Sequence, residues 1–149
     1  MRAKTAAFVL LLASSLALGQ RFGIEFRADS LYMDPAIEIE VPYSSQFTWL
    51  VGASFTFHDG FSGSYALANR YYLSPTQTGL YSGTRFYLTQ TGTWFGFVLG
   101  GKGFFFPKIP GFTAGFEIGA LARVSGEDPA FLQLLLGANI GLRYPLFAP

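Results

Sequence analysis

The sequence predicts an all-β fold, an eight-stranded antiparallel up-and-down β-barrel that spans a membrane. Runs in which bulky apolar residues alternate with small or charged ones recur about eight times between Phe22 and Tyr144. Half of the residues are hydrophobic and 13% are charged, yet past the N-terminus no apolar run reaches the ~18 residues of a spanning helix. The large residues occupy the apolar parity, while Gly, Glu and Arg occupy the polar one. This distribution is typical of a transmembrane barrel, apolar outside and polar inside.

The N-terminal segment predicts a secretory signal peptide. Two basic residues open the chain, the stretch from Ala6 to Leu18 is apolar, and Ala17 and Gly19 fit the small-residue cleavage rule. We therefore expect a signal peptide over residues 1–19 and a barrel domain over residues 20–149. The chain contains no Cys, so a lipidated cysteine anchor and a disulfide are not expected.

The alternating runs set the expected strands, which fall over residues 21–28, 36–42, 46–57, 63–73, 80–89, 94–105, 112–124 and 132–144. Six of these eight runs are 10–13 residues long, which is enough for the ~9–11 residues that a tilted strand needs to cross a bilayer. An even number of strands places both ends of the barrel on the periplasmic side. A soluble ligand-binding barrel such as a lipocalin would show the opposite size pattern, with its bulky residues inside.

Two details of the strands give further expectations. Aromatic residues near strand ends are expected to anchor the membrane interfaces, among them Trp49, Tyr71, Tyr72 and Trp94. Asn69 interrupts the apolar parity of its run, which predicts a bulge or an excursion of that side chain into the interior.

The polar parity collects charged side chains of both signs in the expected lumen. They are Glu25, Arg27, Glu38, Glu40, Arg70, Arg85, Lys102, Glu117, Arg123 and Arg143. Because an unpaired buried charge is costly, we expect these side chains to form a network of ion pairs that plugs the barrel. Six bases against four acids also fit an alternative, a narrow channel or transporter for small hydrophobic or anionic solutes.

The connections on the outer side of the expected barrel carry a cluster of acids. These residues are Asp29, Asp34, Asp59, Glu127 and Asp128, whereas the turns at the opposite end hold none. We expect an acidic outer rim, with divalent cations as a hypothetical partner.

Few residues offer catalytic chemistry, and we expect a non-enzymatic protein without a cofactor. With one His and no Cys, the composition predicts no metal centre such as a zinc site. His58 lies beside Asp59 and near Ser62 and Ser64, so a lipid-modifying enzyme at the outer rim is a further alternative. The expected mature chain has one more acid than bases, which predicts no nucleic-acid partner.

The C-terminal run carries a recognisable pattern, polar-x-Gly-x-x-apolar-x-apolar, at Asn139, Gly141, Tyr144 and Leu146. With the alternation and the strand number, it makes the chain resemble the small eight-stranded outer-membrane barrels typified by outer-membrane proteins A, X and W of Gram-negative bacteria. The resemblance implies export through the inner membrane, insertion into the bacterial outer membrane by the barrel-assembly machinery, and contact with outer-membrane lipid. We expect a monomer with an envelope-structural or surface-interaction role.

Overall fold

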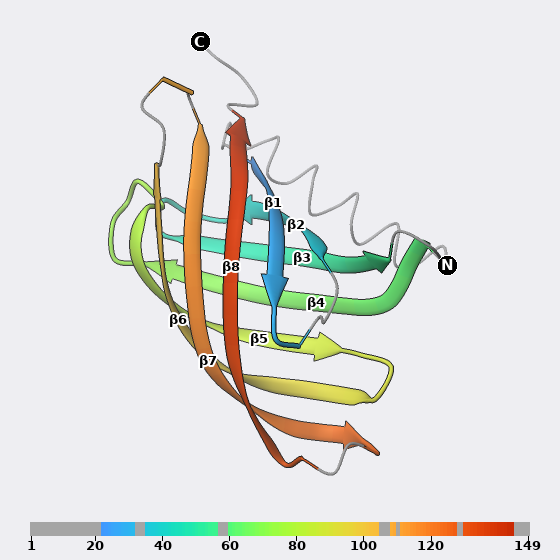
Figure 1. Cartoon of the computed structure of the whole chain (residues 1–149). Coiled ribbons are helices and arrows are strands. Elements are labelled where there is room, and N and C mark those ends of the chain that lie inside the picture. Colours follow the sequence, from blue (N-terminus) through green and yellow to red (C-terminus); the bar gives the residue numbers. More distant parts are fainter. Residues whose placement is uncertain are drawn as a thin grey trace.

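The computed structural model describes residues 22–31, 35–56, 60–104, 108–109, 111–127 and 130–144. These residues form a closed barrel of eight antiparallel strands in which each strand pairs with the next and the last pairs with the first (Figure 1). In chain order they are β1 (Phe22–Asp29), β2 (Ala36–Pro42), β3 (Phe47–Thr56), β4 (Gly60–Tyr72), β5 (Gly79–Leu88), β6 (Gly92–Phe104), β7 (Phe112–Gly126) and β8 (Leu132–Tyr144). The predicted eight-stranded antiparallel barrel is confirmed. In this part of the chain, no helix is long and apolar enough to cross a membrane.

The ladders are regular except at two places. In the β3–β4 ladder the pairing register shifts between Ala53 and Phe55. In the β6–β7 ladder it shifts between Thr93 and Trp94. At Asn69 the ladder is continuous, because this residue pairs with Trp49 on β3 and with Thr84 on β5. The predicted bulge or interior excursion at Asn69 is therefore wrong. Its side chain keeps the outward parity.

The two faces of the barrel differ clearly from β4 to β8. On β6, burial alternates from Trp94 to Gly100, with Phe97 72% exposed and Val98 1% exposed. Arg70 and Arg85 are 0% and 1% exposed, whereas Leu134 on β8 is 65% exposed. Large apolar side chains thus cover the outside and long charged side chains fill the inside, the reverse of a water-soluble domain.

The interior has two layers. An apolar cluster lies next to the connections that follow β1 and β5, and it consists of Leu31, Ala36, Ala66, Tyr87, Trp94, Val98, Leu121 and Leu135. The charged side chains occupy the layer beyond this cluster, toward the opposite end of the barrel. The apolar layer has no counterpart in the sequence expectations.

The expected interface aromatics divide between the two faces. Trp49 and Tyr71 face outward, and Trp49 packs edge-on against Phe47 with ring centroids 5.5 Å apart. Trp94 and Tyr72 lie inside, 1% and 0% exposed, so their expected role at an interface is wrong. Their parity explains this, since each alternates with outward neighbours on its own strand.

A glycine on β6 makes room for one of the interior tyrosines. A Cβ atom built on Gly100 would lie 2.4 Å from the phenol oxygen of Tyr81 on β5. The Tyr81 ring therefore lies directly over the backbone of β6, where it can reach Glu117 on β7. This close approach depends on the missing side chain.

Candidate functional site: the charged interior

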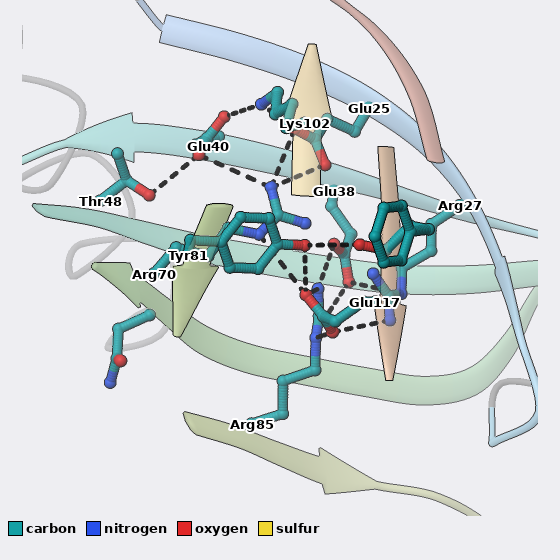
Figure 2. A network of polar contacts seen from close by, with 12 residues as sticks. Glu25, Arg27, Glu38, Glu40, Thr48, Arg70, Tyr81, Arg85, Lys102 and Glu117 are labelled. Atoms are coloured by element: carbon teal, nitrogen blue, oxygen red, sulfur yellow. Dashed lines mark hydrogen bonds and ion pairs between the residues drawn. The ribbon is translucent and has the colours of Figure 1, made fainter. Parts of the chain in front are cut away.

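The charged layer draws side chains from seven of the eight strands. β1 and β2 each supply two members, and β4 to β8 supply one each: Glu25, Arg27, Glu38, Glu40, Arg70, Arg85, Lys102, Glu117 and Arg143. Figure 2 labels all of these except Arg143. All are buried, and the most exposed of them, Arg143, is 7% exposed. The expected lumen residues are thus brought together, with the exception of Arg123. Their meeting follows from the strict period of two, which sends every second side chain of each strand inward.

Glu117 is one of two centres of the network. One of its oxygens accepts hydrogen bonds from Arg85 Nε and, at 2.8 Å, from Arg27 Nη2. The other accepts from the Tyr81 hydroxyl at 2.8 Å and lies 3.5 Å from Arg70 Nε. A single carboxylate therefore contacts three guanidinium groups.

Glu38 forms a two-pronged pair with one of these same cations. Arg85 Nη1 donates to Glu38 Oε1 at 2.6 Å, and Arg85 Nη2 donates to Glu38 Oε2 at 3.0 Å. Arg27 Nε lies 3.8 Å from Glu38 Oε1. Such bidentate geometry fixes the orientation of both side chains in addition to pairing their charges.

The second centre is the ammonium group of Lys102, which lies between the carboxylates of Glu25 and Glu40 and donates to both (Figure 2). Arg70 Nη1 donates to both Glu25 oxygens at 3.0 Å and lies 3.6 Å from Glu40 Oε1. The Tyr72 hydroxyl donates to Glu40 Oε1 at 2.7 Å. Arg70 thus links the Glu25–Glu40 centre to the Glu117 centre.

Arg143 joins the network to the connection between β4 and β5. Its Nη2 donates to Glu40 Oε2 and its Nη1 to the Thr76 carbonyl, both at 3.2 Å, and its guanidinium lies 5.8 Å from the centre of the Tyr72 ring. In the same connection the buried Gln77 side chain donates to the Ser44 carbonyl at 2.8 Å. The 73–78 connection is therefore tied to β8 and to the turn between β2 and β3.

Asp29 belongs to the interior and not to an exposed rim, which corrects the sequence expectation. Its carboxylate accepts from Arg27 Nε and from the Tyr87 hydroxyl, each at 2.6 Å, and its side chain is 0% exposed. The reason is that β1 continues to Asp29, two residues beyond Arg27 and on the same inward parity.

Charge in the described interior is balanced. It holds as many acids (Glu25, Asp29, Glu38, Glu40 and Glu117) as bases (Arg27, Arg70, Arg85, Lys102 and Arg143). The predicted excess of bases is not found, because Asp29 joins the layer and Arg123 does not. Arg123 is half-buried opposite Trp94, and it makes no ion pair with a described residue.

The remaining expected residues are distributed as follows. Glu127 is exposed beside the end of β7, Asn139 and Gly141 are buried on β8, and the Tyr144 backbone pairs with Phe22. The expected residues that lie outside the described part of the chain are Asp34, His58, Asp59, Asp128 and Leu146. The side chain of Ser62 also lies outside it. Within the described ranges, no group of three or more His, Cys, Asp or Glu residues could hold a metal ion.

Sequence reasoning missed the neutral members of the layer. Thr48 donates to Glu40 at 2.9 Å, and the Tyr72, Tyr81 and Tyr87 hydroxyls each donate to a carboxylate. The signal was present, because all four residues occupy the inward parity of their strands. Neutral donors satisfy the carboxylate lone pairs that the cations leave open.

No protein-family model matches the chain, and neither a curated protein nor a solved structure matches it. Its likeness to the small outer-membrane barrels is therefore one of architecture, the closed eight-stranded antiparallel barrel. Any function has to be argued from the two faces of that barrel.

Proposed function

We propose that this chain is a non-enzymatic integral protein of the bacterial outer membrane, with an envelope-structural role and a lumen closed by its own side chains. One observation carries the proposal. The long charged side chains of the barrel are buried inside, while Phe, Leu and Ile side chains stand exposed around its outside.

The outer face supports a lipid environment. Exposed large apolar residues occur on every strand from β4 to β8, among them Leu67, Phe86, Phe97, Phe116 and Ile140. Water-soluble monomers rarely expose a contiguous apolar surface on this scale. A barrel also leaves no strand edge with unpaired backbone groups, which is the requirement for crossing a bilayer with strands.

The inner face supports a closed lumen. The charged layer is neutral overall and is cross-linked through Glu117, Glu40 and Arg70. On one side of the charged layer, Trp94 and its apolar neighbours fill the lumen. On the other side, Arg143 binds the 73–78 connection. An anion conduit would need an excess of cations, and the described lumen does not have one.

Two partner proposals accompany this function. Insertion by the barrel-assembly machinery rests on the C-terminal pattern around Asn139 and Gly141, which the resemblance implies. Cation bridging at an acidic rim rests on Asp34, Asp59, Glu127 and Asp128, because Asp29 is engaged inside. Unchanged calcium or magnesium affinity after neutralising these four residues would remove the second proposal.

Cell fractionation combined with gel electrophoresis and conductance tests the function. We expect the protein in the outer-membrane fraction, with different gel mobility before and after boiling, and no steady unitary conductance in a planar bilayer. Recovery as a soluble protein without detergent would contradict the membrane role. Steady conductance would contradict the closed lumen and favour the channel alternative.

A further inference from the structure

The apolar outer face is interrupted at one place by neutral polar side chains. Away from the strand ends, the polar outward-facing side chains that the structure describes are Asn69 on β4 and Ser82 and Thr84 on β5. They are neighbours, since Asn69 pairs with Thr84 and Ser82 lies two residues along the strand. Polar groups in a lipid-facing surface are costly and usually mark a contact with a partner.

Asn69 and Thr84 satisfy part of each other's hydrogen-bonding capacity. Asn69 Nδ2 donates to Thr84 Oγ1 at 2.7 Å, and the Thr84 backbone N–H donates to Asn69 Oδ1 at 3.2 Å. One amide hydrogen of Asn69 and the hydroxyl hydrogen of Thr84 are left over for a partner outside the described residues of this chain. A hydrocarbon chain has no acceptor for them.

The polar residues lie in a hollow of the outer face. This hollow has a volume of about 590 Å³ and extends from Asn69 across β5 and β6 to Leu134 on β8. A second hollow of about 320 Å³ adjoins it and shares Ser82, Leu99 and Ile118 with it. The depression arises because Ser82, Thr84 and Ala120 are small, whereas the outward positions around them carry Phe, Leu and Ile.

A large side chain projects within this hollow, between its lining residues on β5 and β7. Phe97 on β6 pairs with Thr84, is 72% exposed, and packs edge-on against Phe95 with ring centroids 6.3 Å apart. Neighbouring strands lie ~4.8 Å apart, so Phe97 and the hollow sit at nearly the same depth in any membrane that the barrel spans. The face therefore carries a projection and a depression side by side.

We propose that a second copy of this chain docks on the face formed by β4 to β7, with the Phe97 ring of each copy entering the hollow of the other. A two-fold axis along the membrane normal places residues of equal depth in the two copies next to each other. Such an axis requires a self-complementary patch. The spare donors of Asn69 and Thr84 then meet the hydroxyl and amide oxygens of the partner. The patch is uncharged, so two copies do not repel each other there.

This inference rests on the proposed membrane location, and it replaces the monomer expected from the sequence. A lipid acyl chain is the competing occupant of the hollow. It would fill the apolar walls but would leave the donors of Asn69 and Thr84 unpaired, and it would not need the adjacent projection of Phe97.

The natural lack of Cys allows a direct test by cross-linking in outer membranes. A Ser82→Cys variant places one thiol in the proposed interface, and Ile39→Cys places one on β2, which lies opposite β6 in the ring of strands. With a short bifunctional maleimide, Ser82→Cys should give a band of twice the chain mass and Ile39→Cys should not. Equal or absent cross-linking of the two variants would overturn the inference.

A second measurement separates the occupants. The mass of the purified protein in lipid nanodiscs should be that of a dimer for the wild type and for Ile140→Ala, and that of a monomer for Phe97→Ala and Thr84→Leu. A wild-type monomer, with or without bound lipid, or a dimer that survives both interface substitutions would refute the second copy as partner. Boiled and unboiled gels run on every variant report folding. A protein absent from the membrane fraction would instead refute the proposed function.

Discussion

Neutralising Glu117 should destabilise the barrel more than any comparable change on its surface. Glu117→Gln keeps the size of the side chain and one acceptor oxygen, but it removes the negative charge that faces Arg27, Arg70 and Arg85. The interior then has one more base than acids. Tyr81 loses the charged acceptor of its 2.8 Å hydrogen bond.

The expected loss of stability follows from the buried cations that the substitution leaves without the Glu117 charge. Removing one partner of a buried ion pair typically costs about 3–5 kcal/mol, because the opposite charge is buried without compensation. Arg85 keeps its two bonds to Glu38, and Arg27 keeps Asp29, which limits the damage. We therefore expect the free energy of unfolding to fall by about 3 kcal/mol, the lower end of that range.

Urea unfolding of the protein in detergent micelles, followed by the gel shift between folded and unfolded bands, measures this loss. Glu127→Gln is the matched control, since it makes the same chemical change at an exposed site and should alter stability by less than about 0.5 kcal/mol. Equal stability of the two variants would refute the assignment of Glu117 as a centre of the network.

Three further predictions use the same unfolding assay. Gly100→Ala should lower the free energy of unfolding by about 1–3 kcal/mol, because its Cβ would lie 2.4 Å from the Tyr81 phenol oxygen. Gly103→Ala is the control and should be tolerated, since a Cβ there would have nothing within 4 Å. Equal effects of the two substitutions would contradict the contact between Gly100 and Tyr81. Trp94→Ala should cost about 3–5 kcal/mol by emptying the apolar layer, and a near-neutral effect would place Trp94 outside the barrel. Tyr81→Phe should lower the free energy of unfolding by about 1–3 kcal/mol, because it leaves a lone pair of Glu117 unsatisfied. In a protein that already carries Glu117→Gln, the same substitution should have little further effect. Additive losses of stability would contradict the hydrogen bond between Tyr81 and Glu117.

The strands and their faces were predictable because period-two alternation is a local property. The run over residues 36–42 matches β2, and the inward parity correctly groups Glu25, Glu38 and Glu117. The same rule would have placed Trp94 inside, since it alternates with Phe95. Its expected interface position came from its residue type and its place near a strand end, and parity outweighed both.

The partners inside the barrel were not predictable, because they depend on closure and on the stagger of the strands. Arg27 and Glu117 are ninety residues apart in the chain and meet across the lumen. Asp29 was assigned to a rim because the expected strand ended one residue earlier. A one-residue error at a strand end was enough to move a carboxylate from the interior to an exposed loop. Together with the inclusion of Arg123, it suggested an unbalanced lumen.

The central claim is that the outer face meets lipid and the inner face does not, and the two tryptophans of the chain test it directly. Trp94→Phe leaves Trp49, which faces outward, and Trp49→Phe leaves Trp94, which is 1% exposed inside the barrel. The measurement is tryptophan fluorescence of each variant in bilayers with brominated acyl chains, compared with ordinary lipid. Trp49 should be strongly quenched and Trp94 nearly unaffected. Absence of quenching in both variants, or stronger quenching of Trp94, would contradict the account.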